Sequence, residues 1–393
     1  MAGRGKSHVA AIDLVRTLTI LGVVSVHSTW FTNDSQNFSA NAVMDVLHFT
    51  REVFLFMTAF VLFYNYYDRP LDLRRFWPRR FKLVAFPYVI WSIFYLVYGG
   101  ALRQGLGPFL ATLGHALLTG TAWFHLYYLL VTMQIYLAFP LLLWLVRRTE
   151  GHHRTLLVVA GVFDLVLFGV YQYWAGPLAA WLPGWLRWVV SLRGQVFFTY
   201  EFFLVLGALA AVHYRAVAAW VAAHGRLVAL LFVGSLVAMW AAFAVGVLVF
   251  HQSVAFASGV LQPLMVPYAA AVIGGLFWLG LKWAERRARW PRGSALVSLV
   301  ADLSFGIYLV HPWFLQQIAT YLVPQVGALT RLVVTPATVL LTFAVATLAV
   351  RLIAATPLSV YLIGRETLPW PARVRHDDAR PAPMRGQASY GSR

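Results

Sequence analysis

The stretch AIDLVRTLTILGVVSVH, residues 11–27, decides the fold class of this chain. Its apolar run extends over 9–31, and about 20 apolar residues are enough to cross the roughly 30 Å hydrocarbon core of a bilayer as a helix. The same stretch carries Asp13, Arg16 and His27. Ionisable groups inside a membrane are costly unless they are paired or hydrated, so they point to a functional site. We therefore predict a first membrane helix that carries chemistry.

This first segment lacks the pattern of a cleavable signal peptide. Charged residues interrupt its apolar run, and no small-residue cleavage site follows it. We expect the segment to be retained as a membrane helix.

The composition extends the membrane assignment to the whole chain. Of its 393 residues, 60% are hydrophobic and 11% are charged, and the mean hydropathy is +0.69. Soluble domains carry roughly 25% charged residues, so most of this surface must face something other than water. The absence of Cys excludes disulfides, thiolate metal sites and cysteine nucleophiles.

Apolar segments of membrane-spanning length recur along the chain. We predict ten spans, at 9–31, 46–67, 82–100, 123–146, 155–175, 195–213, 227–250, 261–283, 295–320 and 332–354. The apolar stretch 108–120 is too short to cross, and we expect it at the membrane interface. The predicted fold is an all-α, polytopic transmembrane bundle over 1–364. A disordered cytoplasmic tail is predicted at 365–393, where Arg, Pro and Gly occur without apolar periodicity.

The Lys and Arg residues of the connecting segments indicate the orientation. Basic residues outnumber acidic ones, 31 to 14, and those outside the spans fall mainly in alternate loops. The rich set includes the clusters at 69–82, 147–154 and 282–292, whereas the other set carries only Arg103, Arg187, Arg193 and Arg331. The positive-inside rule then places both termini in the cytoplasm of a multi-pass cell-membrane protein. Orientation explains this basic excess, so no nucleic-acid partner is predicted.

The three ionisable residues of the first helix share one face. Asp13 and Arg16 are three residues apart and can pair. Arg16 and His27 are eleven apart, which is about three turns, or an axial distance of about 16 Å. The alternative is that Arg16 snorkels to the interface and His27 packs against another helix.

Depth along the predicted spans sorts the other polar residues into two layers. Asp302 and Arg351 fall in the inner half, beside Asp13 and Arg16. The outer half holds His27 together with Arg51, Glu52, His125, Glu201 and His311. The two layers together could line a route from the cytoplasm to an outer site, although interhelical hydrogen bonding explains His125 and Glu201 equally well. Asp164 is isolated, and we interpret it as a packing residue.

The segment LDLRRFWPRRFKLVAFP, residues 71–87, is predicted as a basic loop leading into the third span. Six cations lie between Arg69 and Lys82. Anionic lipid headgroups would satisfy such a cluster. A nucleotide phosphate is the sharper alternative, because Arg binds phosphate through two parallel hydrogen bonds. The sequence contains no Walker-type loop, dinucleotide-binding glycine turn, zinc-type His-Glu helix or serine elbow.

Taken together, these motifs resemble the acyltransferase 3 family, whose members are membrane enzymes that O-acylate extracytoplasmic sugars and related acceptors. The first helix is similar to the family's pattern of Asp, then Arg, then a His separated from that Arg by ten residues, here Asp13, Arg16 and His27. FLFMTAF, residues 54–60, resembles an aromatic-rich segment that ends in Ser-Gly-Phe. Thr58 and Ala59 stand here in place of Ser and Gly.

Three further motifs carry the resemblance over most of 9–354. RRFKLVAFPY, residues 79–88, resembles the family's Arg-x-x-Arg segment before a proline-bearing helix, with Lys82 at the second basic position. WFHLYYL, residues 123–129, resembles the motif that opens a later span. LSFGIYLVH, residues 303–311, is similar to a Ser-x-x-Ile-Tyr-Leu-x-His signature, which singles out Ser304, Tyr308 and His311.

The resemblance implies that acyl-CoA, and most simply acetyl-CoA, is the acyl donor. It also implies a path by which this donor enters the bundle. The CoA phosphates would be held by Arg79, Arg80 and Lys82. The pantetheine arm would then pass Arg16, which Asp13 would orient. No metal is expected.

The resemblance also implies a reaction at the outer end of this path. His27 would act as general base for an acceptor hydroxyl, or would carry the acyl group transiently. His311 would position the acceptor or stabilise the oxyanion. The expected partners are membrane lipid and an extracytoplasmic glycan, glycolipid or lipid-linked acceptor. The chain carries no hydrolase-like extracytoplasmic domain, so we expect it to act alone or to hand its acyl group to a separate transferase. The alternatives are a transporter or flippase of a lipid-linked saccharide, and a membrane scaffold.

Overall fold

A computed structural model describes residues 9–325 and 331–368, and within these ranges every regular element is helical. The long helices are α1 (Ala10–Thr32), α3 (Thr50–Tyr66), α4 (Leu73–Tyr98), α6 (Tyr127–Arg148), α7 (His153–Gly169), α12 (Gly225–Leu248), α14 (Met265–Arg286), α15 (Pro291–Tyr321) and α16 (Arg331–Ala354). Shorter helices connect them, namely α2 (Phe38–Leu47), α5 (Leu106–Thr119), α8 (Ala175–Ala179), α9 (Gly184–Ser191), α10 (Glu201–Val212), α11 (Tyr214–Ala223), α13 (Val254–Ala257) and α17 (Ser359–Ile363). The predicted all-α class is confirmed.

Nine helices of the described chain are long and apolar enough to cross a membrane. Each coincides with a predicted span, and the second span extends back to include α2. The sixth predicted span, 195–213, is the exception. Its helical part, Phe197–Val212, turns by 93° into α11, and counting this bent pair as one span raises the total to ten. The prediction of a polytopic bundle of about ten spans is therefore confirmed.

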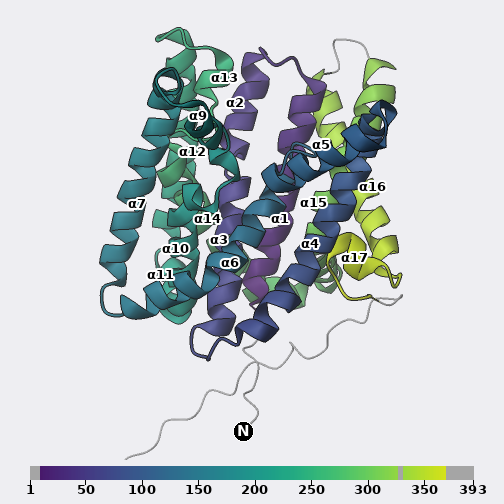
Figure 1. The fold of residues 1–393 in the computed structure, drawn as a ribbon. Helices are drawn as coiled ribbons and strands as arrows, with labels where there is room; N and C mark the ends of the chain where they lie inside the picture. Colours follow the sequence, from purple (N-terminus) through teal and green to yellow (C-terminus); the bar gives the residue numbers. More distant parts are fainter. Residues whose placement is uncertain (1–8, 326–330, 369–393) are drawn as a thin grey trace, which may run out of the picture.

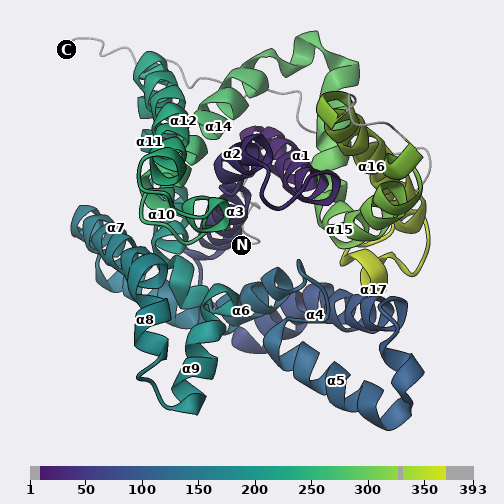
Figure 2. The same cartoon turned by 90° about the horizontal axis from the view of Figure 1, so that it is seen from above.

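Helix α1 occupies the middle of the bundle (Figure 2). It packs against α2, α3, α14, α15 and α16. Half of its apolar window is buried inside the protein, compared with 17% for the peripheral helices α7 and α12. Helix α1 is therefore enclosed by other helices to a much greater extent than α7 and α12 are.

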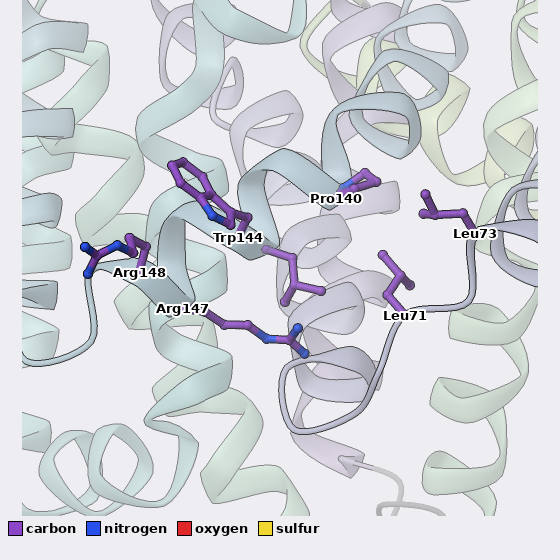
Figure 3. Close-up of a pocket in the computed structure, with 7 residues that line it drawn as sticks. Leu71, Leu73, Pro140, Trp144, Arg147 and Arg148 are labelled. Atoms are coloured by element: carbon purple, nitrogen blue, oxygen red, sulfur yellow. The ribbon is translucent and has the colours of Figure 1, made fainter.

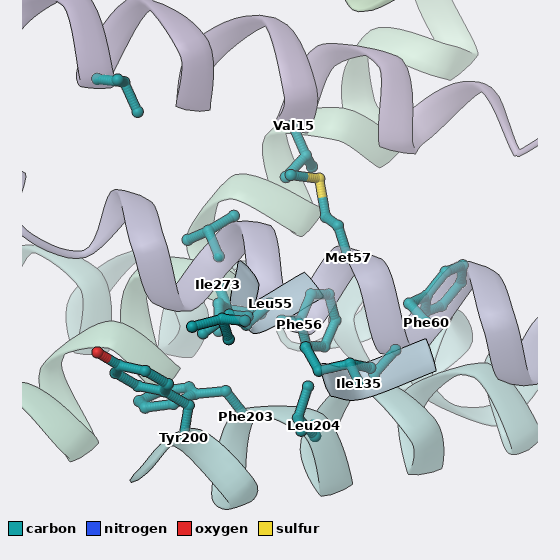
Figure 4. Packing of buried hydrophobic residues seen from close by; sticks show 14 of the residues in the cluster. Val15, Leu55, Phe56, Met57, Phe60, Ile135, Tyr200, Phe203, Leu204 and Ile273 are labelled. Atoms are coloured by element: carbon teal, nitrogen blue, oxygen red, sulfur yellow. The ribbon is translucent and has the colours of Figure 1, made fainter. Parts of the chain in front are cut away.

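Two glycines allow helices to approach closely in this core. A Cβ at Gly207 of α10 would lie 2.3 Å from the backbone oxygen of Phe56 on α3, and a Cβ at Gly280 of α14 would lie 2.5 Å from that of Ala11 on α1. Figure 4 shows how Phe56, Phe203 and Leu204 pack in the α3–α10 contact. This packing fixes the helices that carry the polar residues.

The basic segment 71–87 is not a loop, contrary to the prediction. Helix α4 begins at Leu73, and the side chain of Asp72 caps it by accepting a hydrogen bond from the Arg74 amide at 3.0 Å. The cations lower the local hydropathy but do not interrupt the helix. The predicted span, which was placed by hydropathy, therefore started about two turns too late. The short stretch predicted at the interface forms α5, a 14-residue apolar helix.

Helix α1 begins and α17 ends at the same end of the bundle (Figure 1). The predicted cytoplasmic tail, 365–393, lies outside the described residues from 369 onward. Before that point, Arg365 forms an ion pair with Asp302, with Nη2 and Oδ2 3.0 Å apart. The cytoplasmic location of the two termini stays a prediction.

Candidate functional site

A pair of histidines from α1 and α15 forms the centre of the candidate site. His27 Nδ1 lies 2.8 Å from His311 Nε2, and the two rings stack with their centroids 5.1 Å apart. His311 is fully buried, whereas His27 is partly exposed. Both residues were predicted as site residues at similar depth, and the structure brings them into direct contact across 284 residues of sequence.

The hydrogen bonds of His311 determine which nitrogen of His27 is left free. His311 Nδ1 lies 2.8 Å from the backbone oxygen of Tyr308 and 3.1 Å from that of Ile307. Carbonyl oxygens only accept, so His311 Nδ1 carries the hydrogen and, in the neutral ring, Nε2 is an acceptor. His27 Nδ1 must therefore donate to His311. In a neutral His27 this leaves Nε2 with a free lone pair, which is what a general base requires.

Aromatic rings and a third histidine surround this pair. The Phe124 ring packs edge-on to His27 with centroids 4.8 Å apart, and the His125 ring lies 5.8 Å from that of His311. His125 is 2% exposed, and neither ring nitrogen has a hydrogen-bond partner among the described residues. Its backbone oxygen accepts a hydrogen bond from the Tyr308 hydroxyl. His125 therefore belongs to the same cluster. Two features of the sequence indicated this, its place in WFHLYYL and its predicted depth beside His27 and His311.

A second feature is a cavity of about 260 Å³ in the half of the bundle where Arg16 and Asp302 lie. Its lining comes from five helices and Gly364, and the polar lining residues are Arg16, Thr58, Arg80, Tyr128, Thr132, Tyr136, Asp302, Ser304 and Tyr308. Residues of all five sequence motifs thus meet in one space. Tyr308 lines this cavity, and its ring centroid lies 6.0 Å from that of His311, so it adjoins both the cavity and the histidine pair.

Of the three predicted phosphate-binding cations, one faces this cavity. Arg80 shares the inward face of α4 with Phe76, Val84 and Pro87, which are buried at helical spacing. Its Nε is buried and has no hydrogen-bond partner among the described residues. Arg79 and Lys82 are exposed on the outside of the same helix. Arg80 is thus available to an anion inside the cavity, and the other two cations are available at the surface.

The ionisable residues predicted for the inner half of the bundle lie on α1, α15 and α16. Asp13 is buried one turn before Arg16 on α1. That it orients Arg16 stays a prediction. Asp302 pairs with Arg365, and Arg351 Nη1 donates to the backbone oxygen of Leu368 at 3.2 Å. Asp302 and Arg351 therefore hold the segment after α17 against the bundle.

Another pocket, of about 450 Å³, lies beside the turn between α3 and α4 (Figure 3). It is lined mainly by apolar side chains and by Arg147 and Arg148. Arg147 donates hydrogen bonds to the backbone oxygens of Tyr66, Tyr67 and Arg69 at 2.6–3.1 Å. These bonds commit its guanidinium to fixing the turn, so we do not place a ligand here.

Comparison with known proteins agrees with the arrangement of these motifs. The family described as an acyltransferase domain, acyltransferase 3, matches residues 9–351, which is nearly the whole chain. No curated protein and no solved structure matches it. The matched range runs from the start of α1 into the last turn of α16 and includes both histidines, Arg16 and Arg80. The chain therefore belongs to the acyltransferase 3 family and is an integral membrane acyltransferase.

Proposed function

We propose that this protein transfers an acyl group, acetyl in the simplest case, from cytoplasmic acyl-CoA to a hydroxyl of an extracytoplasmic carbohydrate, glycolipid or related acceptor. The observation that carries the proposal is the hydrogen bond between His27 and His311. It leaves the lone pair of His27 Nε2 unused on the partly exposed member of the pair.

In the proposed reaction, His27 Nε2 takes the proton of the acceptor hydroxyl as the hydroxyl oxygen attacks the thioester carbonyl carbon. The new C–O bond forms, the C–S bond breaks, and CoA leaves as a thiolate that recovers the proton from the His27 imidazolium. His311 accepts a hydrogen bond from Nδ1–H of His27 throughout the reaction. It thereby orients the His27 ring and stabilises its charged form, as the third residue of a catalytic triad does for its histidine.

This geometry favours a positioning role for His311 over direct contact with the acceptor. Its Nδ1 is committed to two backbone oxygens and its Nε2 to His27. We therefore assign it as the residue that orients His27, in place of the predicted contact with acceptor or oxyanion.

The cavity next to the pair supports a donor path from the basic end of the bundle. Arg80 and Arg16 both line it, so two cations lie along the route of an incoming acyl-CoA. We propose that Arg79 and Lys82, exposed on α4, meet the outer phosphates of CoA, that Arg80 holds a deeper one, and that Arg16 lines the path of the pantetheine arm. The thioester would then pass Tyr308 to reach His27.

The direct test is consumption of acetyl-CoA by the purified protein in detergent, measured as release of free CoA. Wild type should release CoA in the presence of an acceptor, and His27→Gln should not. A transporter or flippase would release none in either form. Comparing the acyl content of surface glycans and lipids in cells with and without the gene would then identify the acceptor.

A further inference from the structure

A cavity of about 690 Å³ lies at the end of the bundle opposite the turn between α3 and α4, and the proposed mechanism does not use it. It is formed by the π-helical segment η2 (Val170–Trp174), α8, α9 and residues 255–261. Figure 1 shows α9 and α13 at this end. The orientation predicted from the loop charges makes this the extracytoplasmic end.

Two arginines line this cavity. Arg187 and Arg193 are two of the four loop cations predicted for the extracytoplasmic side, where Lys and Arg are otherwise scarce. Among the described residues that line it, none is a carboxylate, and Gln172, Ser191 and Ser258 add neutral hydrogen-bonding groups. A cavity with two cations and no lining acid is suited to an anion.

Arg193 is held in place and yet has an unused donor. Its Nη1 donates to the backbone oxygen of Val190 at 3.2 Å, and its guanidinium carbon lies 6.0 Å from the centre of the Tyr171 ring. Its backbone oxygen accepts a hydrogen bond from Thr199 at 2.6 Å. The Nε atom is buried without a hydrogen-bond partner among the described residues. An unpaired buried donor of this kind is costly unless a ligand accepts from it.

The backbone around this cavity is also unusual. Tyr171 and Gln172 lie in the π-helical turn, and such turns occur frequently at functional sites. Gln172 Nε2 donates to the backbone oxygen of Phe256 at 2.7 Å and so ties this turn to the opposite wall. The π-helical wall of the cavity and the wall formed by residues 255–261 are thus joined by a hydrogen bond.

Exposed tryptophans indicate the depth of the site. Trp174, Trp181, Trp185 and Trp188 are 53–88% exposed on and around α8 and α9. Tryptophan is enriched at the level of the lipid headgroups. A ligand in this cavity would therefore present its charged group near the membrane surface.

An ion pair of α3 adjoins one wall of this cavity. Arg51 donates to the backbone oxygen of Val260, a lining residue, at 3.2 Å, and it pairs with the buried Glu52. Helix α3 in turn packs against α1, the helix that carries His27.

We propose that this cavity binds the anionic group of the acceptor, a phosphate or carboxylate carried by a saccharide or by a lipid headgroup. Arg193 would be its main ligand, and Arg187 would contribute from the rim. The assignment of this ligand as acceptor rests on the proposed function, whereas anion binding itself does not.

The test is a binding experiment with two probes. Glucose 1-phosphate is titrated into the protein in phosphatidylcholine nanodiscs, and lipid retention is measured by native mass spectrometry from nanodiscs that contain phosphatidylglycerol. Arg193→Gln removes the charge. Gly176→Trp fills the cavity, since Gly176 lines it and a Cβ there would meet no atom within 4 Å. The matched controls are Arg103→Gln and Gly184→Trp, which alter a cation and an equally open glycine outside the lining.

We expect Arg193→Gln to weaken binding of at least one probe about 10- to 100-fold, as expected for loss of a charged hydrogen bond. Gly176→Trp should weaken binding of the same probe, because the indole would occupy the cavity. Both controls should stay within about twofold of wild type, which the same energy scale separates clearly. A response to glucose 1-phosphate identifies a saccharide anion, and a response confined to phosphatidylglycerol identifies a headgroup. The proposal is overturned if neither probe binds, or if all variants bind each probe equally.

The His27→Gln variant separates this inference from the proposed function. It should bind the responsive probe like wild type while losing acyl transfer. Retained transfer in this variant would refute the catalytic assignment and leave the anion site standing. If His27→Gln lost transfer, and if Arg193→Gln and Gly176→Trp bound the probes like wild type, the anion site alone would be refuted.

Discussion

The cavity that contains Arg80 and the histidine pair of α1 and α15 are neighbours, but their polar groups are satisfied in opposite ways. In the cavity, the buried Arg80 Nε has no partner among the described residues. In the pair, His311 uses both ring nitrogens and His27 uses one, so a single lone pair is left. Tyr308 adjoins both regions.

This difference indicates a division of labour. A buried N–H donor without a partner is costly, and a ligand phosphate that accepts from it offsets this cost, so the cavity is suited to binding. A network that leaves one defined lone pair is suited to proton transfer, because the position and tautomer of the base are already fixed.

The largest expected effect is all-or-none and concerns which end of the bundle faces the cytoplasm. Because the loop cations gather at one end, reporter fusions at residue 36, between α1 and α2, and at residue 380 should report opposite sides of the membrane. A periplasmic phosphatase and a cytoplasmic fluorescent reporter at each position measure this. Reporting from the same side would contradict the ten-span topology on which the proposed path of acyl-CoA depends.

The next effect concerns the orienting role of His311. His311→Phe keeps a ring but removes the acceptor for His27 Nδ1, and we expect it to lower the transfer rate about 10- to 100-fold, as losing the partner that orients a histidine does elsewhere. His311→Gln has a carbonyl oxygen that can replace this acceptor, so it should retain more activity than His311→Phe. The readout is the transfer rate at saturating acetyl-CoA. Equal losses in the two variants would argue for a packing role.

A smaller effect is expected in the cavity, where Arg79 and Arg80 form a matched pair on one helix. Arg80→Gln should weaken CoA binding by about 1.5–3 kcal/mol, the contribution of a charged hydrogen bond. Arg79→Gln alters an exposed cation, and its effect should stay within about fivefold in affinity. Calorimetric titration of CoA into both variants compares them. If Arg80→Gln bound CoA as tightly as wild type, the basic cluster would be better explained as a binding site for anionic lipid headgroups.

Most of this fold could be predicted from the sequence, because each membrane helix corresponds to one continuous apolar segment of sufficient length. The prediction missed the start of α4, because the cations there lower hydropathy without ending the helix. It also missed the bend after α10, because no Pro or Gly marks Val212 and His213. A hydropathy window cannot detect a change of direction in a continuous apolar run.

The site was predictable only in part. Helical spacing placed Arg16 and His27 on one face, and depth placed His27 level with His311. Contact between them depends on how α1 and α15 are rotated, which no local pattern encodes. The separation of Arg80 from Arg79 follows from the inward face of α4, and that face could be identified only once the segment was known to be helical. The tautomer of His27 required the hydrogen bonds of His311.

The central claim is that charge in the cavity binds the donor and that His27 performs the transfer. Steady-state kinetics with varied acetyl-CoA on His27→Gln and Arg80→Gln, side by side, tests it most directly. We predict that His27→Gln lowers kcat about 10²–10⁴-fold with KM near wild type, since a general base acts in the transition state. Arg80→Gln should raise KM with kcat nearly unchanged. If His27→Gln kept most of the wild-type kcat, or if both variants changed the same parameter, this division of labour would be contradicted.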